Sequence, residues 1–128
     1  MSTAYDAAVL IADTAREVDP EIRTYPTLRD AVTVPALVVL AGEPFATFHE
    51  RFEVDEATYV FDVVLLASKQ NEAVAQQRLY GWVDPRGALY RALDALEGMS
   101  LVEAVNVGNY DVGTATYWGG TLRVTFDG

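Results

Sequence analysis

The segment Thr58–Ala67 constrains the fold more than any other part of the chain. It reads Thr-Tyr-Val-Phe-Asp-Val-Val-Leu-Leu-Ala, and β-branched and aromatic residues of this kind favour strands. A second apolar run, Pro35–Leu40, is short and opens on a proline, which predicts a strand buried on both faces. Between the two runs, apolar and charged side chains alternate along Phe45–Val54. We therefore expect a long antiparallel β-hairpin at about 45–67.

Glycine, proline and acidic residues indicate where the chain turns. Gly42-Glu43-Pro44 predicts a turn before the hairpin, and Asp55-Glu56-Ala57 predicts the turn of the hairpin itself. Gly108 indicates a bend or bulge within β structure, and Gly119-Gly120 predicts a turn before the last strand. The edge of a long hairpin is either an interaction surface or an aggregation hazard.

Three segments have the apolar spacing of helices. Residues 4–17 carry alanines and Ile11 on one face, with Ser2 or Thr3 as the N-cap. The second helix is expected over 71–83, with Asn71 as its N-cap, and the third over 87–96, with Gly98 as a stop.

The remaining segments return to β structure. Ile22–Tyr25 reads as a short strand, and Leu101–Val107 reads as another, with Tyr110–Thr116 continuing it or pairing nearby. In the last strand Leu122, Val124 and Phe126 are expected to point inward, alternating with Thr121, Arg123 and Thr125. The helices are grouped rather than alternating with strands, which favours an α+β fold. We expect one domain over 1–128, with a mainly antiparallel, mixed sheet and an N-terminal helix and two central helices packed on one face.

Composition excludes several classes of protein. The 128 residues include no cysteine, so disulfides, thiolate metal sites and thiol nucleophiles are excluded. The N-terminal residues lack the pattern of a secretion signal, and no apolar stretch approaches the roughly 18 residues of a membrane span. We expect a cytoplasmic location before any assembly, and no membrane contact.

The charge balance argues against a DNA-binding protein. Nineteen acidic residues and nine basic residues give a net charge of −10. Duplex-binding proteins need a basic footprint that releases phosphate counterions, and here the cations are scattered singly along the chain. The acidic surface either serves solubility or lets DNA pass without adhering.

The sequence offers little that resembles a catalytic or metal site. His49 is the only histidine, and one histidine without cysteine does not make a typical structural zinc site. On a strand, Glu50 points to the opposite face from His49, and no Gly-x-Ser-x-Gly motif positions a serine. Asp62, inside the apolar strand, is expected on the solvent-facing side with Val60 and Val64. We expect no catalytic residue, no metal ligand and no cofactor.

The order of elements resembles the tail-terminator (tail-completion, neck) proteins of siphophages, particularly those of actinobacterial phages. The resemblance rests on the strand Asp62–Ser68, the polar helix start Lys69–Ala73 and the Gln77–Leu93 segment, followed by a β-rich end. The N-terminal helix, Tyr25-Pro26 and the Val34–Val39 strand match in the same order. The resemblance covers nearly the whole chain, but its motifs describe a fold and carry no binding residue over.

The resemblance implies a structural virion protein of the phage neck. It implies a ring, commonly of six subunits, that terminates the tail tube and joins it to the head connector, with DNA passing through the lumen. The partners would be other copies of the chain, the tail tube protein and a head-completion protein. Two alternatives stay open. One is a protein of another tier of the neck, and the other is a small-ligand-binding domain or an enzyme that uses His49. By position alone, the candidate interface residues are Phe45, Phe48, His49, Glu50, Arg51, Phe52, Glu53, Tyr117 and Trp118.

Overall fold

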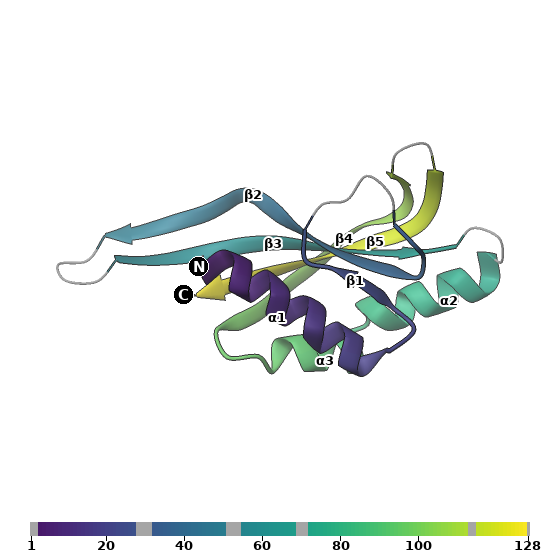
Figure 1. Cartoon of the computed structure of the whole chain (residues 1–128), viewed down its shortest axis with the longest axis horizontal. Coiled ribbons are helices and arrows are strands. Elements are labelled where there is room, and N and C mark those ends of the chain that lie inside the picture. Colours follow the sequence, from purple (N-terminus) through teal and green to yellow (C-terminus); the bar gives the residue numbers. More distant parts are fainter. Residues whose placement is uncertain (1–2, 28–31, 51–54, 69–71, 113–114, 128) are drawn as a thin grey trace.

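A five-stranded mixed sheet carries three helices on one of its faces (Figure 1). The structure is a computed structural model, and it describes residues 3–27, 32–50, 55–68, 72–112 and 115–127. In chain order its elements are α1 (Thr3–Val18), β1 (Arg23–Tyr25), β2 (Ala36–Glu50), β3 (Asp55–Ala67), α2 (Glu72–Val83), α3 (Ala88–Asp94), β4 (Met99–Val112) and β5 (Ala115–Asp127).

The strands lie in the order β1-β2-β3-β5-β4. β1 runs parallel to β2, and the other neighbours are antiparallel. The predicted α+β fold with a mainly antiparallel, mixed sheet is therefore confirmed. The strand predicted over Pro35–Leu40 is buried on both faces as expected, since Leu37 and Val39 face the helices while Ala36 and Val38 belong to a cluster on the other side.

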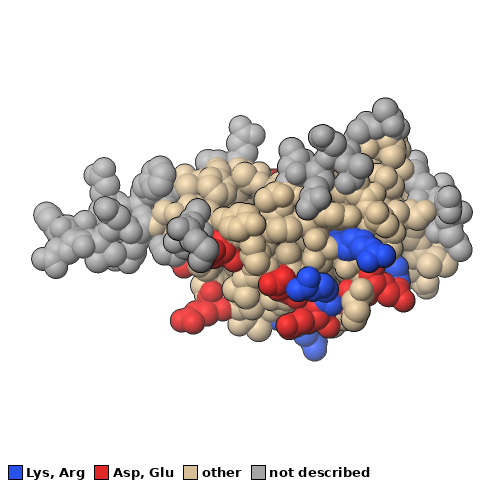
Figure 2. Space-filling view, in the orientation of Figure 1, with Lys and Arg blue, Asp and Glu red and all other residues tan. Residues whose placement is uncertain are grey.

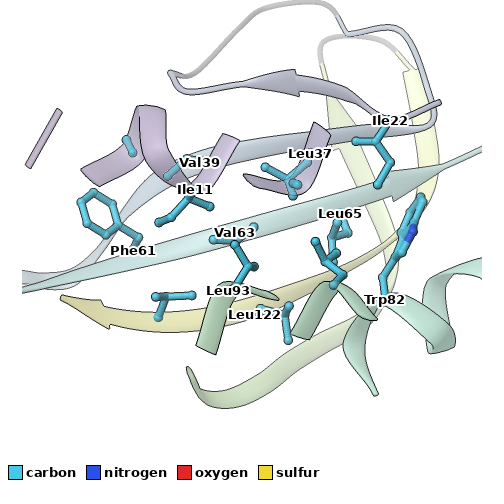
Figure 3. Close-up of a cluster of buried hydrophobic side chains, with 14 of the residues drawn as sticks. Ile11, Ile22, Leu37, Val39, Phe61, Val63, Leu65, Trp82, Leu93 and Leu122 are labelled. Carbon is cyan, nitrogen blue, oxygen red and sulfur yellow. The ribbon is translucent and has the colours of Figure 1, made fainter. Parts of the chain in front are cut away.

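The main core lies between the sheet and the helices (Figure 3). Strands β3 and β5 line it with alternate residues, as the period of two in a strand requires. Its fully buried members from these two strands are Val63, Leu65, Leu122 and Val124. The prediction that Leu122 and Val124 point inward is confirmed. Thr121 differs from the expectation, because it is buried on the other face, where its hydroxyl is hydrogen-bonded to that of Tyr110.

The helices follow their sequence signals closely. α1 buries five alanines and Ile11, so small side chains bring this helix close to the sheet. Asp6 in its first turn and Arg16 in its last turn suit the helix dipole. α2 ends at Val83, directly before Asp84-Pro85, where proline stops the helical hydrogen bonding. α3 ends at Asp94, two residues before the predicted end.

The hairpin of β2 and β3 is confirmed, but its two predicted turns are wrong. Gly42-Glu43-Pro44 lies within β2 at a large bulge, where residues 42–45 stand opposite the single residue Val60. The bulge tolerates a proline, which has no N–H to donate. Gly42 is required because an added Cβ would lie 2.5 Å from Val60 Cγ1. Asp55-Glu56-Ala57 does not turn either, since it pairs with 48–50.

The C-terminal strands also correct a predicted turn. Gly119-Gly120 lies inside β5, opposite Leu65 and Leu66 of β3. The ring of Tyr110 covers this part of the strand, so an added Cβ at Gly119 would be 2.6 Å from Tyr110 Cδ1. The bulge expected near Gly108 is confirmed as a register shift between Val105 and Gly108, and β4 continues past it.

The sheet narrows from its centre toward the hairpin. Near Leu65 all five strands run side by side, whereas β5 ends opposite Thr58. Beyond that row, residues 55–57 pair only with β2. β2 and β3 extend past the helices as a two-stranded arm (Figure 1).

Candidate functional site

Three aromatic side chains meet where the arm leaves the helix-covered part of the sheet. Phe45 projects from the bulge of β2, and its ring centroid lies 5.5 Å from that of Tyr59 and 5.7 Å from that of Phe61. Phe61 is buried, whereas Phe45 is 37% exposed. The bulge therefore presents an aromatic side chain at the surface and anchors it on two residues of β3.

An open groove lies beside this aromatic group. Its volume is about 550 Å³, and its lining is mostly apolar. The lining residues are Ala4, Tyr5 and Ala8 of α1, Pro26 and Thr27 after β1, Val39, Leu40, Ala41 and Phe45 of β2, and Phe61 of β3. None of these side chains carries a charge.

The groove exists because β1 is short. β1 pairs only with residues 36–38 of β2, and Pro26 directs the chain away from the sheet. Arg23 N donates a hydrogen bond of 2.9 Å to Pro35 O. This bond joins the first residue of β1 to the residue that precedes β2. The following residues of β2, Val39–Ala41, then form one wall of the groove, and the alanines of α1 form another.

Three of the nine predicted interface residues, Phe45, Tyr117 and Trp118, have side chains that the structure describes, and of these Phe45 lines the groove. Phe48, His49 and Glu50 belong to the distal part of β2, opposite residues 55–57, and their side chains fall outside what the structure describes. Arg51, Phe52 and Glu53 lie outside the described residues. The roles predicted for these six residues stay predictions.

Tyr117 and Trp118 are far from the hairpin arm. Trp118 is paired with Ala67, at the opposite end of β3. Successive residues of a strand point to opposite faces. Accordingly, Trp118 packs against the main core, and Tyr117 packs against the cluster on the other face. Both are half-buried, so the structure does not bring the two sets of predicted interface residues together.

Asp62 is part of an ion-pair network that crosses three strands. Arg123 Nε lies 3.3 Å from Asp62 Oδ1, and Arg123 Nη1 lies 3.0 Å from Glu103 Oε1. Asp62 does share a face with Val60 and Val64, but that face is not simply solvated. Val64 is buried there by a second apolar cluster that includes residues flanking β1. The network therefore explains the carboxylate within the apolar strand.

Sequence reasoning missed the contribution of α1 to the groove. Tyr5 is 51% exposed beside the buried Ala4 and Ala8. The available signal was an aromatic residue that falls outside the apolar face of a predicted helix. The pairing of this helix with the edge of β2 depends on the tertiary fold, so the sequence alone did not reveal it.

The groove is suited to apolar contact rather than to acid–base chemistry. The polar side-chain groups among its described lining residues are the hydroxyls of Tyr5 and Thr27. Among the described residues, no group of three His, Cys, Asp or Glu side chains could hold a metal ion. No helix of the described part of the chain is long and apolar enough to span a membrane.

Among the carboxyl groups that the structure describes, one has a clearly shifted pKa, and it lies away from the groove. Asp84 is in the turn between α2 and α3, and its pKa lies below the ordinary value of 3.8. The main cause is the backbone N–H of Arg86, which donates a hydrogen bond of 2.9 Å to Asp84 Oδ1. This contact stabilises the turn and has no connection with the groove.

No model of a known protein family matches the chain, and no curated protein matches its sequence.

Proposed function

We propose that this protein is a structural subunit of a siphophage neck, in which copies form a ring that terminates the tail tube and joins it to the head connector. The observation that carries the proposal is the β2–β3 arm, which extends past the helices and has at its base an exposed aromatic group and a groove whose described lining is uncharged. An isolated two-stranded arm is marginally stable in water. Its length is therefore better explained by contact with another subunit or with the tail tube than by the stability of the subunit.

The charge of the protein is consistent with this role. A net charge of −10 per subunit would keep the lumen of a ring from binding the phosphate backbone of DNA. We expect weak or no binding to duplex DNA at moderate salt. A salt-dependent, sub-micromolar affinity in a gel-shift assay would contradict this part of the proposal.

A small-ligand-binding domain is the second candidate, because the groove falls within the usual range of ligand pockets, about 300–1,000 Å³. Such pockets enclose most of the ligand and place several polar groups around it. Here the groove is open and its described lining offers two hydroxyl groups, so we favour a protein contact. Another tier of the phage neck would use the same surfaces and is distinguished by its partner.

The test is electron microscopy of the purified protein and of tails assembled with and without it. We expect rings of the protein, and rings at the ends of complete tails, as well as tubes of uncontrolled length when the protein is omitted. Tails that end normally without the protein would overturn the proposed function.

Arg51→Glu tests whether the hairpin is the assembly surface. Arg51 lies outside the described residues, and the prediction comes from the alternation of apolar and charged residues in the hairpin. We expect the variant to keep the circular dichroism spectrum of the native protein and to lose tail-end occupancy. A folded Arg51→Glu protein that still caps tails, together with a Phe48→Asp protein that does the same, would place the assembly surface elsewhere.

A further inference from the structure

One side of α2 presents a second exposed surface, on which the described side chains are uncharged. The helix buries Ala75, Leu79 and Trp82 against the sheet. Its opposite side is exposed and includes two large side chains, Val74 (55% exposed) and Tyr80 (56% exposed). The helical repeat places Gln77 between them. Of the described side chains of α2, Arg78 is the charged one, and it turns to Glu21, with which it forms an ion pair.

The exposed side of α2 also contains Gly81, which the subunit itself does not explain. A Cβ added there would meet nothing within 4 Å. Glycine within a helix costs roughly 1 kcal/mol relative to alanine. A glycine on an exposed helical face leaves room for another chain to approach closely, so it fits a contact surface.

We propose that α2 of one copy lies in the groove at the base of the hairpin of the next copy. The two surfaces are at opposite ends of the helical layer: the groove is beside the N-terminal end of α1, and α2 is at the other end, with α3 packed between the two helices (Figure 1). A contact between two different surfaces repeats from copy to copy and closes into a ring when the rotation permits. A convex apolar helix in a concave apolar groove is a common recognition mode.

Charge favours a second copy as the occupant. Two chains that each carry −10 repel one another, so they associate best where neither presents carboxylates. Among the side chains that the structure describes, those that line the groove and those on the exposed side of α2 meet this condition. On the face shown in Figure 2, the described charged side chains gather over the helices in the lower half of the view. A basic partner would be attracted there rather than to a groove whose described lining holds no charge.

The size of the contact indicates that it is weak on its own. α2 has 12 residues and is therefore about 18 Å long. A standard interface buries about 800 Å² on each partner, which is more than one such helix covers in an open groove. The proposal rests on the proposed ring for the rest of the interface, which the hairpin arm would supply. We expect the isolated protein to be monomeric at low concentration and to form rings as the concentration rises.

Engineered cysteines test the contact directly, because the chain has no cysteine of its own. A double variant, Tyr5→Cys with Val74→Cys, places one thiol at the groove and one on α2. With a short bifunctional maleimide we expect a ladder of cross-linked species that ends at the ring. The matched control is Leu10→Cys with Val74→Cys, since Leu10 is 43% exposed on α1 but does not line the groove. This control should give no ladder.

The outcomes separate this proposal from the proposed function. Native rings at tail ends without cross-linking of the double variant would overturn the groove contact and leave the neck function standing. A full ladder with no protein at tail ends would overturn the neck function and leave the groove contact standing. If Tyr5→Cys or Val74→Cys by itself gave cross-linked dimers, the contact would be two-fold, and the proposal would be overturned. Cross-linking of position 5 to a different tail protein would also overturn it.

A charge placed on α2 provides an independent measurement. Tyr80→Glu adds a carboxylate to an exposed position, so folding is retained, and we expect ring formation to need a roughly thirty-fold higher protein concentration, as loss of an interface anchor implies. Val102→Glu is the control, because Val102 is equally exposed, on the edge strand β4. Rings that form equally well from native protein and from Tyr80→Glu would overturn the proposal, as would an equal loss with Val102→Glu.

Discussion

The centre of the sheet and the hairpin arm are built from the same two strands but have different surroundings. At Val63–Leu66, strand β3 lies between β2 and β5, its side chains are buried on both faces, and helices cover one side. At 55–57 the same strand has only β2 beside it. Apolar burial is the main source of folding free energy. The comparison therefore indicates that the centre contributes most of the stability of the folded protein and that the arm contributes little.

The largest expected difference between these regions concerns core truncation. Leu122→Ala, at a fully buried position, should lower the free energy of unfolding by about 2–5 kcal/mol. Phe45→Ala, at the base of the arm, should lower it by about 1 kcal/mol, because Phe45 is partly exposed. Urea denaturation measures both. Equal losses would show that the aromatic group is part of the stabilising core, and the distinction between the two regions would fail.

A second prediction concerns the glycines that face each other across β4 and β5. Gly119→Ala should lower the free energy of unfolding by about 1–3 kcal/mol, because its Cβ would meet the Tyr110 ring and, at 3.0 Å, the carbonyl oxygen of Leu65. Gly108→Ala is the matched control, since its Cβ would enter open space, and its effect should stay within about 0.5 kcal/mol. If thermal denaturation gives the two variants the same stability, the close packing described for Gly119 is absent.

A smaller effect is expected from the ion-pair network on the face opposite the helices. Arg123→Met removes the partner of Asp62 and Glu103 and should cost about 1 kcal/mol, since the arginine and Asp62 are two-thirds or more buried. Arg16→Met breaks a pair with Asp13 in which both side chains are at least half exposed, and it should cost under about 0.5 kcal/mol. Urea denaturation of both variants at neutral pH and low salt tests the ranking, and a larger loss for Arg16→Met would reverse it.

The smallest effect concerns pH and the turn between α2 and α3. The pKa of Asp84 is lowered in the folded protein, so its ionised form contributes stability above the ordinary pKa of 3.8. That contribution is lost as the pH falls through the folded pKa. Asp84→Asn should therefore lose slightly less stability than the native protein on acidification below about pH 4. An NMR titration in which the Asp84 carboxyl has a pKa at or above 3.8 would contradict this prediction.

The sequence predicted the helices and strands better than it predicted the turns between them. The strand at Thr58–Ala67 and all three helices were predictable because their apolar periodicity is local. Gly42-Glu43-Pro44 and Gly119-Gly120 have the composition of turns, yet both lie within strands. Val60 and the Tyr110 ring occupy the space where side chains would be, and such contacts between distant residues leave no local signal.

The candidate site was predictable only in part. Phe45 was identified because, like Phe48 and Phe52, it is too apolar for a freely solvated loop. The groove beside it also requires the short strand β1 and the alanines of α1, which come from three separate parts of the sequence. Their meeting depends on strand order, and strand order is a property of the whole fold.

The glycine at 119 also determines how the last two strands align. β4 has two register shifts relative to β5, so its pairing with β5 is irregular at two points. Hydrogen bonding alone would therefore tolerate a slip of one residue. A slip in one direction would bring Trp118 under the Tyr110 ring, where only the bare backbone of Gly119 fits. A slip in the other direction would place Gly120 there, but it would also turn the buried side chains of β5 to the opposite face of the sheet. The Tyr110 ring and Gly119 thus oppose the slip that would place Trp118 under the ring, in addition to the burial of alternate residues of β5.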